Sequence, residues 1–130
     1  MVFHRFMGAG SDDPRPTAVI EVDGEVVGWV DHDEPDAHPW LSAGQCNLGY
    51  HVFASHRGRG YATRAVRLLL ARLAAEATLA EATFLIDAEN GPSLGVAAAV
   101  GAVERGRWAN AAGRPQIFLV VSLATPDPGP

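Results

Sequence analysis

The sequence has 130 residues, of which 48% are hydrophobic, and a formal net charge of −5 at pH 7. A chain of this length can bury one core and is too short for two ordinary domains, so we expect a single domain over residues 1–130. The negative charge argues against nucleic-acid binding, no apolar run is long enough to cross a membrane, and the lone cysteine, Cys46, indicates a reducing cytoplasm.

The chain opens on a segment without a clear structural pattern and continues with a hairpin. Residues 1–16 are rich in glycine, proline and aspartate, which favours an irregular lead-in over a helix or a long strand. Two apolar runs, 17–22 and 25–30, flank Asp23-Gly24, a pair that readily adopts the positive φ angles of a tight turn. Residues 31–45 contain two prolines and few apolar side chains, so we expect a long loop that could border a site.

A third strand leads into a helix. Alternating side chains over residues 47–53 predict a strand with Tyr50 and Val52 on one face and His51 on the other. Over residues 61–77, apolar side chains recur at helical spacing while the arginines point elsewhere, and alanine and leucine favour the helix further. The sequence therefore predicts an amphipathic helix directly after the third strand.

The remaining pattern predicts a buried strand, a second helix and two final strands. The buried strand covers residues 83–87, and the helix runs from about Pro92 to Val100, with Gly101 able to supply a left-handed cap. Strands over 103–108 and 116–123 follow. This order indicates a mixed sheet with helices packed on it, with a core over 17–124 and a frayed tail at 125–130.

The segment Ser55–Ala62 (SHRGRGYA), between the third strand and the first helix, combines glycines with arginines. The first turn of a helix leaves backbone N–H groups unpaired and carries a partial positive charge, so an anion is its natural partner. Gly58 and Gly60 leave room for a pyrophosphate to approach these groups, and the arginines add attraction. An ordinary turn that needs glycine for its backbone angles fits the same spacing, so spacing alone leaves both interpretations open.

Two motifs in this order resemble those of the GNAT acetyltransferase superfamily. Arg57-Gly58-Arg59-Gly60-Tyr61-Ala62 matches the family's Arg/Gln-x-x-Gly-x-Gly/Ala motif at every constrained position. Asn90 with Ser93, followed by Gly101, is similar to the family's second pattern of Asn-x-x-Ser/Ala, a helix and a glycine. The resemblance covers about residues 17–123 and is strongest to the branch that acetylates ribosomal-protein N-termini.

The resemblance implies an α+β (mixed α/β) fold of the GNAT type. Its central, mostly antiparallel sheet would be splayed where CoA binds, with helices packed on it, and most of the usual N-terminal strand and two helices would be missing. The acetyl-CoA pyrophosphate would rest on the loop residues Arg57, Gly58, Arg59, Gly60, Tyr61 and Ala62. The pantetheine arm would pair with the backbone of Val52 and Phe53, and Asn90 would reach it from the other side. Asn90 could also cap the second helix, and the two roles can coexist.

The resemblance also implies direct transfer of the acetyl group to a primary amine, without a metal. Backbone N–H of Val52 or Phe53 could stabilise the oxyanion. Many relatives carry a tyrosine seven residues after the motif asparagine, where this sequence has Ala97. Ser93, or Tyr50 if its hydroxyl turns into the cleft, could instead protonate the departing thiolate. Purely structural roles remain open for Ser93, as a helix-start hydrogen-bonding residue, and for His51, as a solvent-facing one.

The base and the acceptor are the least determined parts of the site. His51 is a candidate base because imidazole titrates near neutral pH, and Asp31 or Asp33 could act through water. The acceptor would be a peptide N-terminus or a small cationic amine, attracted by the acidic residues Asp31, Asp33, Glu34 and Asp36. A degenerate acyl-CoA-binding module without turnover is the alternative function, which Ala97 and the short N-terminal segment favour.

The acceptor-side wall of the family has little room in this sequence, because only sixteen residues precede the first hairpin strand. The wall could be absent, supplied by a partner subunit, or lost to a late start site. We expect a partner subunit or an unusually open site, and hence a homodimer.

Overall fold

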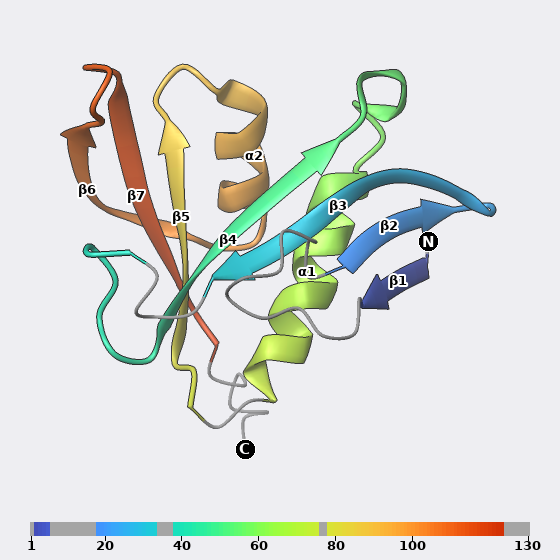
Figure 1. Cartoon of the computed structure of the whole chain (residues 1–130), viewed down its shortest axis with the longest axis horizontal. Helices are drawn as coiled ribbons and strands as arrows, with labels where there is room; N and C mark the ends of the chain where they lie inside the picture. Colours follow the sequence, from blue (N-terminus) through green and yellow to red (C-terminus); the bar gives the residue numbers. More distant parts are fainter. Residues whose placement is uncertain (1, 6–17, 34–37, 76–77, 124–130) are drawn as a thin grey trace.

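The computed structural model describes residues 2–5, 18–33, 38–75 and 78–123. These residues form one seven-stranded sheet in the order β1-β2-β3-β4-β5-β7-β6. All neighbouring strands are antiparallel except β4 and β5, which are parallel. Helices α1 and α2 contact each other and pack on the same side of the sheet (Figure 1). The expected mixed α+β architecture is confirmed.

The first strand was not expected. Strand β1 (Val2–Arg5) pairs antiparallel with β2 (Ala18–Val22), so the prediction of an irregular lead-in is wrong for these four residues. Glycine and proline appear only from Gly8 onward, and their abundance over residues 1–16 concealed a strand-compatible start. Residues 6–17 lie outside the described part of the chain.

The hairpin after β2 forms at the expected turn, but its second strand is longer than predicted. Asp23 and Gly24 have φ angles of 51° and 82°, as a two-residue hairpin turn requires. Strand β3 (Glu25–Asp33) continues past residue 30, because its last three residues pair with β4. The expected loop over residues 31–45 is therefore shorter, and two of its acids, Glu34 and Asp36, lie outside the described residues.

The central strand and helix follow their predicted patterns. In β4 (Gln45–Val52) the side chains of Leu48 and Val52 are buried on one face. Helix α1 (Tyr61–Ala74) buries one stripe of side chains in the same core: Ala65, Val66, Leu69 and Leu73. The helix ends three residues earlier than predicted, and residues 76–77 lie outside the described ranges.

The C-terminal half matches the predicted elements within two residues at each end. Strand β5 (Glu81–Asp87), helix α2 (Gly91–Ala99), strand β6 (Val103–Ala109) and strand β7 (Pro115–Ser122) follow in that order. Gly101 has a φ of 87°, which confirms the left-handed turn after α2. Residues 125–130, the predicted tail, lie outside the described residues. None of the described helices is long and apolar enough to cross a membrane.

The two parallel strands at the centre of the sheet separate soon after they meet. Strand β4 pairs with β5 only from Gln45–Glu81 to Asn47–Thr83, and among the described residues the pairing stops there. At this last pair the Thr83 hydroxyl donates to Asn47 Oδ1 over 3.2 Å. Beyond it the strands diverge, with α2 on one side of the opening and the N-terminus of α1 on the other (Figure 1). The predicted splaying of the sheet is confirmed, and we call this opening the split.

Candidate functional site

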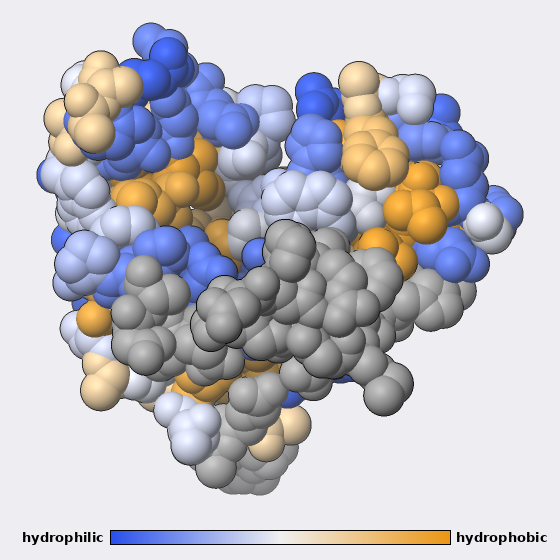
Figure 2. Space-filling model, in the orientation of Figure 1, coloured by the Kyte–Doolittle hydropathy of each residue, from blue (hydrophilic) through white to orange (hydrophobic). Residues whose placement is uncertain are grey.

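A cleft of about 550 Å³ occupies the split. Its walls come from the end of β4, the loop that follows it, and the first turns of α1 and α2. The space-filling view shows a notch between the part of the molecule formed by β5–β7 and the part formed by the β2–β4 strands (Figure 2). A cleft of this size is typical of sites for small molecules and cofactors.

The N-terminus of α1 faces the cleft without a cap of its own. A short 3-10 helix, η2 (Ala54–His56), follows β4, and the chain then turns through Gly58 and Gly60, with φ angles of 77° and 78°. Gly60 is the N-cap residue, and within the described chain no side chain caps the helix and no acid lies in its first turn. The free N–H groups and the helix dipole therefore favour an anion at this wall.

The N-terminus of α2, on the opposite wall, is capped by its own sequence. The side chain of Asn90 accepts a hydrogen bond from the backbone N–H of Ser93 over 3.2 Å. Asn90 also lines the cleft. The predicted capping role of Asn90 is confirmed, while its contact with a ligand stays a prediction. The two helix ends that border the cleft thus differ, and the uncapped end of α1 is the one suited to an anion.

Val52 and Phe53, which were equivalent candidates in the sequence, direct their backbone groups to opposite sides of the chain at the end of β4. The N–H of Phe53 donates to the carbonyl of Val27 over 2.8 Å, so it points toward β3 and is already used. Because backbone groups alternate in direction along a strand, the N–H and carbonyl of Val52 point into the split. The suggestion that Phe53 offers its N–H to a ligand is therefore wrong. The backbone of Val52 keeps the direction that pairing with a bound molecule in the split would require.

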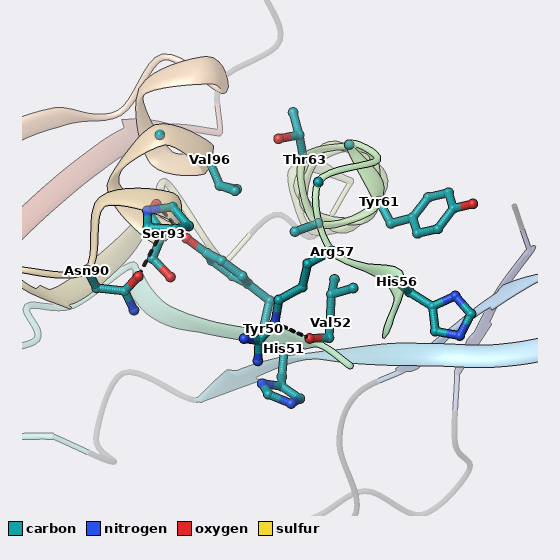
Figure 3. Close-up of a pocket in the computed structure, with 15 residues that line it drawn as sticks. Tyr50, His51, Val52, His56, Arg57, Tyr61, Thr63, Asn90, Ser93 and Val96 are labelled. Atoms are coloured by element: carbon teal, nitrogen blue, oxygen red, sulfur yellow. Dashed lines mark hydrogen bonds between the residues drawn. The ribbon is translucent and has the colours of Figure 1, made fainter. Parts of the chain in front are cut away.

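Arg57 occupies the inner end of this edge. Its Nε donates to the Val52 carbonyl over 2.9 Å, as Figure 3 shows. The guanidinium thus lies inside the cleft beside the backbone that a bound molecule would pair with. Arg59, by contrast, is not among the described residues that line the cleft, so only one of the two motif arginines is placed to touch a ligand there.

Tyr50 and Ser93 meet across the cleft. The Tyr50 hydroxyl donates to the backbone carbonyl of Ser93 over 2.9 Å. Burial raises the pKa of Tyr50, and the hydrogen bond to Ser93 opposes that rise without cancelling it. The phenol therefore stays protonated at neutral pH, with its proton directed at α2. Ala97, where the resemblance would place a tyrosine, is fully buried in the core.

His51 lies on the other face of β4. Figure 3 shows its imidazole pointing away from α1 and α2, opposite to the side chains of Tyr50 and Val52. Its ring centroid is 5.9 Å from that of Trp29 and 5.8 Å from that of Phe53. A role for His51 in the reaction requires the acceptor to enter from this face.

Several lining residues were not predicted. His56 lies in the loop before α1 and contacts Glu25 through a hydrogen bond of 3.2 Å. The others continue the first turns of the two helices: Thr63, Pro92, Gly95 and Val96. Helical spacing from Ser93 would have found Val96, which lies three residues later on the same face of α2. No cluster of three potential metal ligands occurs among the described residues.

Comparison with known proteins places the chain in a family. Residues 3–103 match the family model described as an acetyltransferase (GNAT) domain. The structure is similar to Mycobacterium smegmatis RimJ in complex with CoA-disulfide, with a TM-score of 0.71 and 28% identity over 81% of this chain and 51% of that one. No significant match was found among curated proteins.

Two more distant structures share the fold. A ribosomal-protein-alanine N-acetyltransferase from Brucella melitensis has a TM-score of 0.69 at 20% identity, over 81% of this chain and 67% of that one. Aminoglycoside acetyltransferase AAC(6')-Ib in complex with coenzyme A has a TM-score of 0.71 at 18% identity, over 81% and 64%. The chain spans about half the length of RimJ and about two thirds of these two. Because the family model covers most of the sequence, the chain belongs to the GNAT acetyltransferase family.

Proposed function

We propose that this protein is an N-acetyltransferase that moves the acetyl group of acetyl-CoA directly to a primary amine. One observation carries the proposal: the split joins an uncapped helix N-terminus to a strand edge whose backbone groups are directed into the cleft. The first feature suits a pyrophosphate and the second suits an amide-containing arm. CoA contains both groups in one molecule.

The pyrophosphate would bind the N–H groups of the loop and first turn of α1, from Gly58 to Ala62. The space beside both glycines is open, since a Cβ at Gly58 or Gly60 would meet no other described atom within 4 Å. The solved RimJ and AAC(6')-Ib structures hold CoA or its disulfide, which supports a CoA site in this fold.

The pantetheine arm would pair with the edge of β4. Because the Val52 carbonyl is held by Arg57, the guanidinium would release it as an amide N–H of pantetheine takes its place. The same movement would bring Arg57 toward the phosphates. The Val52 N–H would then serve as the oxyanion donor, since the Phe53 N–H is used by β3.

The reaction needs a neutral amine held against the thioester. The amine nitrogen attacks the acetyl carbon, the C–S bond breaks, and the thiolate leaves as the amide forms. Ser93 would donate a hydrogen bond to the departing sulfur, because the Tyr50 hydroxyl is directed at the Ser93 carbonyl. The proton released by the amine would pass through water to His51 on the opposite face of β4.

The acceptor would be a peptide N-terminus or a small cationic amine, in a cytoplasmic protein. The resemblance of Asn90 and Ser93 to the branch that acetylates ribosomal-protein N-termini favours the first kind, and the acidic residues favour the second. A second candidate function, an acyl-CoA-binding module without turnover, is favoured by the burial of Ala97 at the position where the resemblance expects a tyrosine.

One experiment separates the two functions. Acetyl-CoA binding is measured by calorimetry, and release of free thiol is measured with a panel of primary amines. A transferase binds acetyl-CoA and releases thiol only when a suitable amine is present. Binding without release for every amine would favour the binding module, and the absence of binding would contradict both.

A further inference from the structure

Two connections of the chain meet at one end of the sheet. The turn between β6 and β7 and the turn between β5 and α2 lie side by side there (Figure 1). The backbone N–H of Ala88, the first residue after β5, donates to the carbonyl of Pro115, the first residue of β7, over 3.0 Å. The turn that leads into α2, one wall of the cleft, therefore rests on the hairpin at the edge of the sheet.

Asp87, the last residue of β5, connects the two turns through both of its carboxylate oxygens. Its Oδ1 accepts the backbone N–H of Glu89 over 2.9 Å, and its Oδ2 accepts Arg114 Nε over 2.6 Å. A second nitrogen of Arg114 lies 3.6 Å from the carboxylate of Glu89. The hydrogen bond from Arg114, and after it the one from Glu89, lowers the pKa of Asp87. The carboxylate is thus charged at neutral pH, and its bond to the guanidinium is charge-assisted.

The β6–β7 turn fixes the backbone from which the Arg114 side chain extends. The Asn110 side chain accepts the backbone N–H groups of Ala112 and Arg114, both over 3.0 Å. The backbone N–H of Asn110 donates to the Arg114 carbonyl over 2.9 Å. An asparagine that binds the backbone following it in this way stabilises a turn. Arg114 is therefore held at its backbone by Asn110 and at its side chain by Asp87.

The β5–α2 turn presents the two residues of the α2 wall that the proposed reaction uses. The Asp87 carbonyl accepts the backbone N–H of Asn90 over 2.9 Å, and the Asn90 side chain caps α2 at Ser93. Asp87 thus holds this turn at two successive residues, at Glu89 through its side chain and at Asn90 through its backbone. Neither Asp87 nor Arg114 is among the described residues that line the cleft. Any effect of this pair on the cleft must pass through the turn.

We propose that Arg114, acting through Asp87, is a positioning residue for the α2 wall of the cleft. The inference rests on the proposed transferase function. The pair sets where the Asn90 side chain meets pantetheine and where the Ser93 hydroxyl meets the departing sulfur. Small displacements of such groups weaken binding and slow the reaction. The N-terminus of α1, on the opposite wall, takes no part in these contacts, so the pair acts on the thiol end of CoA and not on its phosphates.

The test replaces Arg114 by methionine, which keeps an unbranched side chain but has no donor for Asp87. Binding of CoA and of adenosine 3′,5′-bisphosphate is measured by calorimetry, and kcat is measured by thiol release with an amine that the wild type acetylates. Arg114→Met should lower kcat and weaken CoA binding, each about threefold, as expected for the loss of an exposed ion pair. Adenosine 3′,5′-bisphosphate has no pantetheine arm, so its affinity should not change.

Two further variants show whether Arg114 acts through Asp87. Arg114→Lys keeps a cation at the same place in the turn and should recover part of the lost kcat. Asp87→Asn has a single side-chain oxygen and no charge, so it should show the same losses as Arg114→Met. The double variant should lose little more than either single one, because both substitutions break one interaction. Additive losses would contradict a shared path through the turn.

Arg107→Met is the matched control for the loss of a surface ion pair. Arg107 lies on the same hairpin, in β6, and pairs with Glu104 over 2.8 Å. Its replacement should leave kcat and both affinities unchanged. Equal effects of Arg107→Met and Arg114→Met, or equal weakening of both ligands by Arg114→Met, would overturn the inference. A wild type that binds CoA but releases no thiol would contradict the transferase function alone, and the CoA affinities of the variants would still decide the inference.

Discussion

Two residues with hydroxyl groups, Tyr50 and Ser93, are in contact at the first turn of α2, and their hydroxyl groups differ in what they bind. Tyr50 donates its proton to the carbonyl of Ser93, whereas no hydrogen bond of the Ser93 hydroxyl occurs among the described residues. Tyr50 is thus occupied in holding the turn, and Ser93 is the hydroxyl that remains available to a leaving sulfur. This assignment gives a direct kinetic prediction.

Replacement of Ser93 by alanine should lower kcat without weakening the binding of acetyl-CoA. Loss of a positioned proton or hydrogen-bond donor costs on the order of a hundredfold in rate. The substitution does not change the backbone N–H of residue 93, which donates to the Asn90 side chain, so α2 keeps its cap. Steady-state kinetics and calorimetry measure the two effects. A variant with full kcat would show that Ser93 only supports the helix.

Replacement of Arg57 should change the affinities for two parts of CoA in opposite directions. Arg57→Leu frees the Val52 carbonyl but removes a cation from the phosphate wall. Pantetheine, which has no phosphate, should then bind up to about tenfold more tightly, while adenosine 3′,5′-bisphosphate should bind more weakly. Arg59→Leu is the matched control, because Arg59 does not line the cleft in the described structure. Weaker binding of both ligands to Arg57→Leu would contradict the account.

The two helices that border the cleft are joined by an arginine. Arg67 on α1 donates to the carbonyl of Ala99 at the last turn of α2 over 3.0 Å. A cation at a helix C-terminus satisfies a free carbonyl and complements the helix dipole. This contact ties α1 to the C-terminal end of α2.

Arg67→Met should therefore lower the free energy of unfolding by about 0.5–1 kcal/mol. Methionine keeps an unbranched side chain on α1 but cannot donate to α2. Arg64→Met, on the same helix, serves as the control and should have almost no effect on stability. Urea unfolding measures both variants, and equal stabilities would show that the Arg67 contact contributes nothing.

Elements with local signals could be predicted from the sequence, and those that depend on a distant partner could not. Asp23-Gly24 and Gly101 specify their turns through backbone angles, and Pro92 marks the start of α2. Strand β1 exists because β2 is beside it, and the end of β3 is extended by pairing with β4. The composition of β1 does not indicate β2 as its partner, and the composition at the end of β3 does not indicate β4.

The same limit applies to the site. The glycines of the α1 loop and the cap at Asn90 were predictable, because both follow from the requirements of a helix start. The difference between Val52 and Phe53 was not, since it depends on which β4 residue faces β3. The contact of Arg57 with Val52 also arises only when the chain turns back through the loop.

Association of two copies of the chain into a homodimer remains a prediction. Strand β6 is at the edge of the sheet, and its Val103 is 58% exposed. An edge strand can pair with the same strand of another subunit, and such a pairing would cover this apolar residue. We expect a dimer by light scattering, with Val103→Lys shifting it toward monomer. A wild-type monomer over the same concentrations would contradict this expectation.

The central claim is that acetyl-CoA binds in the split with its pyrophosphate on the N-terminus of α1. Calorimetry with acetyl-CoA on the wild type, Gly60→Ala and Gly60→Glu tests it most directly. Both variants share the strain of a side chain at a φ of 78°, and only the second adds a negative charge. The account predicts moderate weakening for alanine and loss of detectable binding for glutamate. Equal affinity of the two variants would contradict it.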